Sequence, residues 1–491
     1  MPEKYLAFDL GAESGRGLVA TVENDILTFE EIGRFPTSRG ELDIDDNGVR
    51  RWDIKRISSR MQDMLSQVED ENGAPIDGVG VDTWGVDFGL SDADNVLIEE
   101  PVAYRDASHT VARKNLLSRI TEEQLWTESG VQSLSFNTLF QLQAILERDP
   151  QILARATRLN FMPDLLTSAL GESTDHATER TIASTSQLVD VTSGTWNIKL
   201  LESLHIPSHF LQPIADAGTS VGYSTKGTPL FRVPGHDTAA AVAAVPVRDA
   251  KPWAFISSGT WSLMGTEINK PILSECARNK RLSNEGGINN TTRLLKNIMG
   301  LWLVQECKRS FSKSGADHSY AELAELAHNA PDRGPLIDAI DDRFLAPPDM
   351  PTEIRNACRE SGQEPPNSVA TLIRCCLDSL ALAYKTTLQD LELATGLAFK
   401  RIHIVGGGVK NELLNQLTAN ACGVPVIAGP SEATALGNVY GQMLGSGHVA
   451  SWAEARDLGA KSFKTQTFEP QNELDSWWSE ARLPKPLTHA S

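Results

Sequence analysis

The segment 233–246, VPGHDTAAAVAAVP, carries the residues with the clearest potential for chemistry. His236 and Asp237 follow a Pro-Gly pair, and the run of small residues after them predicts a short helix that Pro246 stops. A helix N-terminus has unpaired N–H groups and so favours an anion. An Asp beside a phosphate-sized anion site can accept a proton from a hydroxyl that attacks a phosphoryl group. The simpler alternative is that Asp237 only caps the helix.

Three glycine-containing turns, near residues 11, 259 and 407, follow predicted strands. Backbone N–H groups of the first two turns can hold phosphates, and the third leaves room for an adenosine against bare backbone. Each turn alone is a weak signal, because most glycine turns after strands are only turns. The complete Walker and dinucleotide-binding patterns are absent from the sequence, so neither of those nucleotide folds is favoured. Together, the three turns are the set that a nucleotide cleft between two domains requires.

The elements that must position these residues alternate between strands and helices, which predicts an α/β fold. Residues 5–8 form a predicted strand that ends at Asp9 and returns through a small-residue hairpin, and residues 253–256 begin a second hairpin of the same kind. We interpret this repetition as an internal duplication of one α/β domain, with both hairpins aimed at a shared cleft. The expected domains are residues 1–245 and 246–460, followed by a partly packed tail, 461–491.

Helical periodicity supports this organisation. Ile54, Ile57, Met61, Met64 and Leu65 share one helical face behind Asp53 as a cap. A long amphipathic helix from residue 369 is expected to stop at Gly396, and Asn411 is expected to cap the helix after the third glycine turn. The segment 331–351 is rich in Pro and Asp and is expected to run over the surface.

The composition is that of an ordinary globular protein, with 41% hydrophobic and 22% charged residues among 491. The net charge of −19, from 45 basic and 64 acidic residues, argues against a nucleic-acid or membrane partner. The six cysteines lie far apart with no C-x-x-C pair, which favours free thiols over a zinc site. No signal peptide or long apolar stretch is visible, so we expect a cytoplasmic protein.

Several motifs together resemble the FGGY family of carbohydrate kinases, and within it the members that phosphorylate L-rhamnulose. The resemblance runs in order from the first strand to about residue 445, and DTWGVD together with GHDTA is its most specific part. The motifs are DLGAESGRG, GVDTWGVDFGL, PVAYRD, FMPDLL, VPGHDTAAAV, SSGTWSLMG, NEGGINNTTRLLKNIMGLWLVQE, IHIVGGGVKN and AGPSEATALGN. It implies a duplicated actin-like and Hsp70-like fold of the ribonuclease H type, with an ATP and sugar cleft between two domains. It also implies ATP-dependent phosphorylation of the sugar at O1.

The resemblance implies a nucleotide site drawn from both domains. Thr260 would contact ATP phosphates, Asn297 and Gln305 would lie near the nucleotide, and Gly407 would lie under its adenosine part. The first hairpin would contact the same phosphates through Ala12, Glu13, Ser14, Gly15 and Arg16. The family often has Ser at the position of Glu13, and a carboxylate there would repel ATP. We therefore expect Glu13 to turn away or to pair with Arg16 or another cation.

The resemblance also implies a sugar site and a metal. Gly85 and His236 would contact the sugar, Trp84 would offer it an apolar face, and Asp237 would be the base. Asp9 would hold Mg²⁺ through water.

Structural alternatives remain open for these assignments. Asp9 could satisfy turn amides, Trp84 could be plain core, and His236 could be a hydrogen-bonded structural residue. Asn297 and Gln305 could be ordinary polar positions. The dipeptide Arg105-Asp106 could be a local ion pair in a loop.

Two other functions remain open beside the main hypothesis. One is a kinase of the same family that acts on L-fuculose, a pentulose or glycerol. The other is a non-catalytic actin-like ATP-binding sugar sensor, which would have no need of a base at Asp237. In either case the expected partners are a small sugar and ATP, and the chain is expected to be a monomer or a homodimer.

Overall fold

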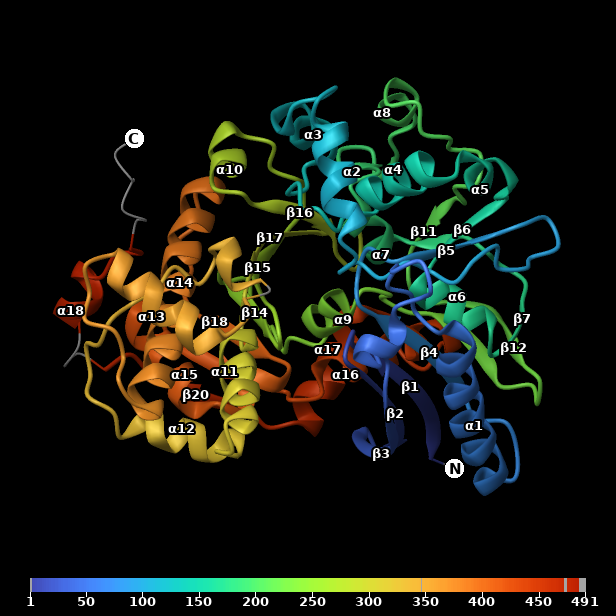
Figure 1. Cartoon of the computed structure of the whole chain (residues 1–491). Helices are drawn as coiled ribbons and strands as arrows, with labels where there is room; N and C mark the ends of the chain where they lie inside the picture. The colour runs from blue at the N-terminus through green and yellow to red at the C-terminus, as the bar shows by residue number, and fades with distance from the viewer. Residues whose placement is uncertain (1, 346, 472–474, 485–491) are drawn as a thin grey trace. The chain divides into compact units, whose positions relative to one another are not determined.

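The computed structural model describes residues 2–345, 347–471 and 475–484, and it divides into two compact units (Figure 1). Each unit combines segments that are distant in the sequence. Unit 1 consists of Met1–Arg248, Glu267–Leu294 and Ala433–Phe463, and unit 2 consists of Asp249–Thr266, Leu295–Glu432 and Lys464–Ser491. The domain boundaries expected after residues 245 and 460 stay predictions.

Unit 1 is built on a seven-stranded mixed sheet. Its strand order is β3 (Ile26–Pro36), β2 (Ser14–Glu23), β1 (Glu3–Leu10), β4 (Gly78–Thr83), β13 (Pro229–Arg232), β12 (Thr219–Ser224) and β7 (Gly171–Ser173). The three central strands β1, β4 and β13 are parallel, and the outer pairs are antiparallel. The residues that follow β1, β4 and β13 therefore meet at one edge of the sheet.

Helices pack on this sheet from both ends of the chain. Helix α1 (Ile54–Asn72) begins behind Asp53, whose carboxylate accepts a hydrogen bond from the Arg56 backbone, and the predicted cap is thus confirmed. Its apolar face, with Ile57 and Met61 fully buried, belongs to the same core cluster as Leu6 of β1. Helix α16 (Ala433–Ser446) packs against β1 and β4, and α17 (Trp452–Ser462) packs against β3 (Figure 1).

A second apolar cluster in unit 1 surrounds β5 (Phe88–Ser91), its antiparallel partner β6 (Arg158–Phe161) and α4 (Thr138–Arg148). The other elements of this unit are short. They are η1 (Gly40–Asp43), α2 (Ser108–Leu116), α3 (Glu122–Ser129), α5 (Pro150–Arg155), α6 (Met162–Ser168), β8 (Thr178–Glu179), α7 (Arg180–Ala183), η2 (Ser184–Ser186), β9 (Val189–Asp190), β10 (Thr195–Trp196), α8 (Ile198–Ser203), β11 (Ile214–Ala215), α9 (Asp237–Ala243), α10 (Glu275–Asn279) and β16 (Ser283–Gly286).

Unit 2 repeats the arrangement with which unit 1 begins. Strand β14 (Ala254–Ser258) pairs antiparallel with β15 (Ser262–Ile268) and parallel with β18 (Ile402–Val405), as β1 pairs with β2 and β4. β18 continues to β19 (Val426–Ala428), which pairs antiparallel with β20 (Gln466–Phe468). The last residues of β15, and those of β17 (Thr292–Ile298) up to Leu294, fall in unit 1. The repeated hairpin agrees with the predicted duplication.

The helices of unit 2 agree with most of the sequence-based expectations. They are α11 (Trp302–Lys313), α12 (Tyr320–His328), η3 (Asp342–Phe344), α13 (Met350–Glu360), α14 (Val369–Thr395), η4 (Gly407–Lys410), α15 (Glu412–Cys422) and α18 (Asp475–Glu480). Gly396 ends α14 in a left-handed conformation, and Asn411 caps α15, as predicted. The surface course expected for residues 331–351 was wrong, because Ile337 and Phe344 are buried there. The composition of the segment is polar and Pro-rich, but its apolar side chains pack into the protein interior.

The remaining expectations concern the tail, the cysteines and membranes. Trp478 in α18 is 2% exposed, so this part of the tail is packed, whereas residues 472–474 and 485–491 lie outside the described residues. All six cysteines are described and are free thiols. Among the described helices, none has both the length and the apolar character that a membrane span needs.

Candidate active site

Three parallel strands of unit 1 bring acidic side chains to one edge of its sheet. Asp9 near the end of β1 and Asp82 near the end of β4 are register partners. Immediately after Asp82, Thr83 forms a parallel bridge with His236, which follows β13. Asp237 is the next residue, and the charges of Asp9 and Asp237 both raise the pKa of Asp82. The structure therefore gathers Asp9, His236 and Asp237 at the strand ends where open α/β sheets bind ligands.

The first predicted phosphate loop is the tight connection between β1 and β2. Arg16 lies opposite Asp9 in the antiparallel pairing, and its Nη2 donates to Asp9 Oδ2 at 2.8 Å. The turn itself is closed by a hydrogen bond from Gly11 N to Ser14 O at 3.0 Å. A Cβ on Gly15 would lie 2.3 Å from a methyl carbon of Leu10, so a larger residue there would force the Leu10 side chain to move. Ala12, Glu13 and Ser14 occupy the tip.

Glu13 at this tip forms an ion pair with Arg105, whose Nη1 lies 2.9 Å from Glu13 Oε1. The partner is thus another cation, one of the alternatives considered for Glu13. Asp106 accepts hydrogen bonds from the backbone of Arg50 and from Ser108. Pairing with Arg105 neutralises the carboxylate that would otherwise repel ATP.

Asp82 is fully buried, and only one of its two carboxylate oxygens has a hydrogen-bond partner among the described residues. Its Oδ2 accepts a hydrogen bond from Asn438 Nδ2 of α16 at 2.7 Å, while Oδ1 has no hydrogen-bond partner among the described residues. Burial raises the pKa of Asp82 well above the usual aspartate range, and Asp9 adds to this effect. An unpaired buried oxygen is costly, so it indicates a ligand or water at this position.

This chemistry fits the magnesium ion that the family resemblance implies. Mg²⁺ prefers oxygen ligands and keeps several of its waters, so it needs only one or two carboxylates. Asp9 and the free oxygen of Asp82 provide such a set. Within the described part of the chain, no three His, Cys, Asp or Glu side chains group closely enough to hold a metal directly.

The turn that carries the proposed base is fixed by Glu179. Its Oε2 accepts hydrogen bonds from Gly235 N and Ile182 N, both at 3.0 Å, and from the Thr181 hydroxyl. Thr181 Oγ1 in turn accepts from His236 N at 3.2 Å. A buried carboxylate with several donors holds this turn in one conformation.

Asp237 is the first residue of α9, and the capping position before it belongs to His236. Asp237 Oδ1 accepts a hydrogen bond from Thr238 N at 2.6 Å and lies 3.4 Å from His236 Nε2. One third of the side-chain surface stays exposed. Desolvation and the charge of Asp9 raise the pKa of Asp237, and His236 acts in the opposite direction. The carboxylate is thus accessible and close to an imidazole, as a base requires.

His236 is held on its other side by a buried ion pair. Glu285 Oε2 lies 3.4 Å from His236 Nδ1 and 3.1 Å from Arg293 Nη2, and that same Nη2 lies 3.3 Å from Nδ1. The Arg293 side chain is fully buried and also donates from Nε to Gly286 O. Burial by itself would raise the pKa of Glu285, but His236 and Arg293 outweigh it and hold that pKa below the usual range.

Trp84 belongs to the core of unit 1 and is 6% exposed, so little of its side chain is open to a sugar. Its Nε1 donates to Asp87 Oδ2 at 2.9 Å, and Trp52 Nε1 donates to the same oxygen at 2.6 Å. The two rings lie with centroids 4.3 Å apart. Asp87 Oδ1 accepts from Gln141 Nε2 at 2.8 Å, and burial raises the pKa of Asp87 to about 6. Asp87 therefore fixes both indoles.

Gly85 and Val86 bring the backbone close to the imidazole. A Cβ on Gly85 would lie 3.4 Å from His236 Nε2, so the structure brings together these two predicted sugar contacts. Val86 has a φ of 68°, which is strained for a β-branched residue. Its N–H donates to Thr185 Oγ1 and its carbonyl accepts from Thr138 Oγ1. Strain held in this way is typical of functional sites.

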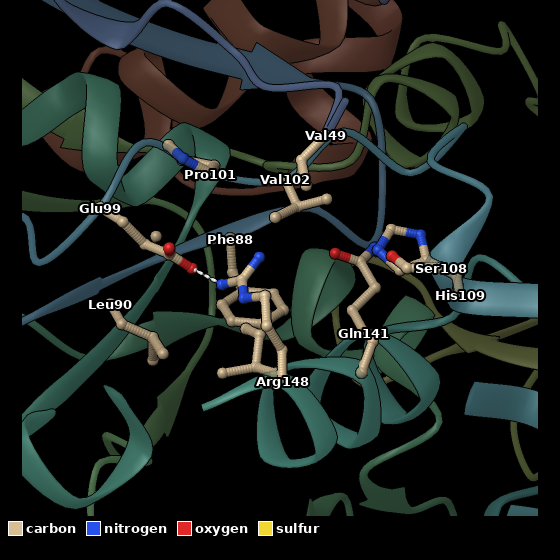
Figure 2. Close-up of a pocket in the computed structure, with 13 residues that line it drawn as sticks. Val49, Phe88, Leu90, Glu99, Pro101, Val102, Ser108, His109, Gln141 and Arg148 are labelled. Atoms are coloured by element: carbon tan, nitrogen blue, oxygen red, sulfur yellow. Dashed lines mark hydrogen bonds and ion pairs between the residues drawn. The ribbon is translucent and has the colours of Figure 1, made fainter. Parts of the chain in front are cut away.

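A cavity of about 170 Å³ lies behind this motif, with β5 and α4 among the elements that line it (Figure 2). Its wall is largely apolar, including Phe88, Leu90 and Val102, and Arg148 forms an ion pair with Glu99 there. Gln141 lines the cavity and also donates to Asp87. Gln141 thus links the cavity wall to the Asp87 carboxylate, which accepts the hydrogen bond from Trp84.

Two of the predicted nucleotide residues of unit 2, Thr260 and Gly407, lie in the turns that follow β14 and β18. Thr260 lies in the β14–β15 hairpin, and its carbonyl accepts a hydrogen bond from Trp302 N at the start of α11, the helix that contains Gln305. Asn297 lies in β17, and only its partial burial is established. Gly407 begins η4 beside the same hairpin. Its neighbour Gly408 cannot carry a side chain, because a Cβ would lie 2.0 Å from Ser258 Oγ.

The sequence analysis did not single out five buried charged residues of unit 1, which are Asp82, Asp87, Glu179, Glu285 and Arg293. Asp82 and Asp87 lie inside the motif DTWGVD, and Glu285 and Arg293 lie inside NEGGINNTTRLLKN. The signal that could have found them is the occurrence of charged residues within otherwise apolar or glycine-rich motifs, because buried charges need specific partners.

Comparison with known proteins identifies the class that this fold and site define. The model of the N-terminal domain of the FGGY family of carbohydrate kinases matches residues 4–231, and that of the C-terminal domain matches residues 254–446. The chain belongs to the FGGY family of carbohydrate kinases and is an ATP-dependent sugar kinase. This confirms the family and the two-domain fold that the motifs predicted.

Individual proteins similar to this chain include curated relatives and solved structures. A protein named rhamnulokinase from Bacteroides thetaiotaomicron is 38% identical over 97% of this chain and 98% of its own length. A rhamnulokinase from Yersinia pestis (strain Pestoides F) is 39% identical over 98% and 99%. The crystal structure of gluconate kinase from Lactobacillus acidophilus covers 98% of this chain and 96% of its own, with a TM-score of 0.77 at 13% identity. Plasmodium falciparum glycerol kinase with ADP also has a TM-score of 0.77 at 13% identity, covering 97% and 96%. At such identity the structural likeness shows the fold alone.

Proposed function

We propose that this kinase phosphorylates L-rhamnulose at O1, giving L-rhamnulose 1-phosphate in L-rhamnose catabolism. The observation that carries the proposal is the similarity, over nearly the whole length of both chains, to proteins named rhamnulokinase. The motifs that hold the predicted sugar contacts support it, because Gly85 lies beside His236 and Trp84 is fixed behind them.

Asp237 is the base in this proposal. It accepts the O1 proton while O1 bonds to the γ-phosphorus and the bond from that phosphorus to the bridging oxygen of ADP breaks. Its exposed carboxylate, its position beside His236 and its raised pKa support this role. Burial and the charge of Asp9 raise the pKa of Asp237, and the charge interaction with His236 lowers it.

Arg16 and the backbone of the β1–β2 turn would contact the ATP phosphates, and Thr260 and Gly407 would contribute from unit 2. Magnesium, held through water by Asp9 with the free oxygen of Asp82 nearby, would neutralise phosphate charge when bound. Glu13 does not act as a phosphate ligand in this proposal, because its carboxylate forms an ion pair with Arg105.

The deciding experiment measures kcat/KM with ATP for L-rhamnulose, L-fuculose, D-xylulose and glycerol in a coupled ADP assay. We expect L-rhamnulose to be best and glycerol to be almost inactive. A clear preference for glycerol or D-xylulose would overturn the substrate and leave the kinase class intact. Absence of ketose-dependent ADP release from a protein that still binds ATP would instead favour a non-catalytic sugar sensor.

A second experiment tests the base. Asp237→Asn should lower kcat on the best sugar by about 10²–10⁴, the usual range for loss of a general base, with ATP binding retained. Near wild-type turnover of the folded variant would show that Asp237 is not the base.

A further inference from the structure

The imidazole of His236 has different partners on its two nitrogens. Nε2 faces Asp237 Oδ1 at 3.4 Å, and Nδ1 faces both Glu285 Oε2 at 3.4 Å and Arg293 Nη2 at 3.3 Å. The first contact leads to the proposed base. The second leads to a carboxylate that is 7% exposed and a guanidinium that is fully buried.

This pair can serve Nδ1 in either of two protonation states. When Nδ1 is unprotonated, it can accept a hydrogen bond from Arg293 Nη2. When Nδ1 carries a proton, it can donate to Glu285. In both states Nε2 carries a proton and can donate to Asp237. The remaining tautomer, with a bare Nε2, would set a lone pair against a carboxylate oxygen and is disfavoured.

The orientation of the imidazole decides which oxygen of Asp237 can react. Oδ1 already accepts from Thr238 N at 2.6 Å and lies beside the imidazole. No described residue donates a hydrogen bond to Oδ2. Oδ1 accepts from Thr238 N and from the Thr238 hydroxyl at 3.3 Å and lies 3.4 Å from Nε2, whereas Oδ2 keeps its lone pairs for the sugar hydroxyl.

We propose that Glu285 and Arg293 are positioning residues of the kinase reaction, which act through His236 to hold Asp237 with Oδ2 directed to the sugar. This inference rests on the proposed role of Asp237 as base. It adds two residues that touch neither substrate. Their effect is on the orientation of the base and so on kcat, with little effect on sugar or ATP binding.

Glu285→Gln is the most direct variant, because it keeps the shape and removes the charge. We expect kcat to fall about tenfold while KM for sugar and for ATP changes less than about threefold. Arg293→Lys keeps the charge, but an ammonium lacks the planar guanidinium whose Nε bonds to Gly286 O while Nη2 reaches Nδ1 and Glu285, so we expect a smaller fall. Asp378→Asn is the matched control, since it breaks a buried ion pair with Arg374 in unit 2. It should lower thermal stability and leave kcat unchanged.

A double-mutant cycle separates positioning from general damage. If Glu285 acts through the imidazole, adding Glu285→Gln to His236→Gln should cause no further loss of kcat. Equal losses in the two backgrounds, or no loss in either, would overturn the inference. If Glu285→Gln does not fold, the same cycle is made with Arg293→Lys. Asp237→Asn distinguishes the two failures: an active variant refutes the base itself, whereas an inactive one with unaffected Glu285→Gln refutes only the positioning.

Discussion

Asp9 and Asp82 are register partners across two parallel strands, yet their carboxylates have opposite environments. Asp9 is paired with Arg16, whereas Asp82 is buried with one oxygen bonded to Asn438 and the other unpartnered among the described residues. Arg16, which pairs with Asp9, lies on β2, on the far side of β1 from Asp82, so the two carboxylates would leave a negative charge in excess when both are ionised. This excess favours a cation at the same sheet edge as the proposed base.

The first prediction concerns magnesium. Asp82→Asn removes the buried charge and keeps the hydrogen-bonding shape, so we expect the half-saturating Mg²⁺ concentration to rise about fivefold or more at fixed ATP. Titration of free Mg²⁺ in the coupled assay measures this. Asp63→Asn, on the exposed side of α1, is the control and should change nothing. An unchanged Mg²⁺ requirement in Asp82→Asn would contradict a cation at this edge.

The second prediction concerns the fit of α16 against α9, the helix that begins with Asp237. A Cβ on Gly437 would lie 1.8 Å from the Ala240 carbonyl oxygen, so Gly437→Ala must push the two helices apart. We expect a loss of about 1–3 kcal/mol of unfolding free energy and a lower kcat. Chemical denaturation and the kinase assay measure the two effects. Gly334→Ala is the control, since the space around Gly334 is open, and it should change neither stability nor kcat. Full activity of Gly437→Ala would mean that α9 does not need this contact.

The third prediction concerns pH. Burial raises the pKa of Asp164 to about 8, and its Oδ2 has no hydrogen-bond partner in the described structure. The folded protein therefore binds this proton more tightly than the unfolded chain, and the resulting stability is present at pH 4 and lost as pH rises through 8. Asp164→Asn should flatten the fall of unfolding free energy between about pH 4 and 8. Asp249→Asn is the control, since the pKa of Asp249 is lowered to about 2 by Arg401, so its contribution is lost only in acid. An equal slope in wild type and Asp164→Asn would contradict the prediction.

The fourth prediction concerns the tryptophan pair. Asp87→Asn keeps one acceptor for the indoles but turns an amide N–H₂ toward Gln141, which is itself a donor. We expect about 1–3 kcal/mol of lost stability and a higher KM for the best ketose, because Gln141 loses its acceptor and a neutral amide oxygen holds Trp84 Nε1 less tightly than the carboxylate does. Thermal unfolding and a ketose panel measure both effects. Trp52→Phe is the control, because it removes only the Trp52 donor to Asp87 and should raise KM less. If it raises KM as much as Asp87→Asn does, the change in KM comes from packing and not from the orientation of Trp84.

Local signals in the sequence predicted local features well. The cap at Asp53, the end of α14 at Gly396 and the cap at Asn411 each depend on residues a few positions apart, so short patterns determine them. The family motifs likewise identified the strand ends and turns. Burial of Ile337 within a Pro-rich segment was missed, because its packing depends on α14 far along the chain.

The candidate site was predictable where one motif supplies neighbouring residues, as with His236 and Asp237. It was not predictable where partners come from separate segments. The pair between Glu13 and Arg105, and the contact of Glu285 and Arg293 with His236, join residues about 50 to 90 positions apart. Single-sequence patterns carry no information about such pairings, because they are fixed by the tertiary fold.

The bond between Asn438 and Asp82 also constrains the order of events during synthesis. The two residues are 356 positions apart, and Gln442 of the same helix bonds to the carbonyl of Leu6 over 436 positions. At about 5–20 residues per second, a ribosome needs roughly 20–70 s to make α16 after it has made β4. During that time the nascent sheet of unit 1 lacks its C-terminal helix and exposes apolar strands. The growing chain therefore needs protection from aggregation until nearly all of it has been made.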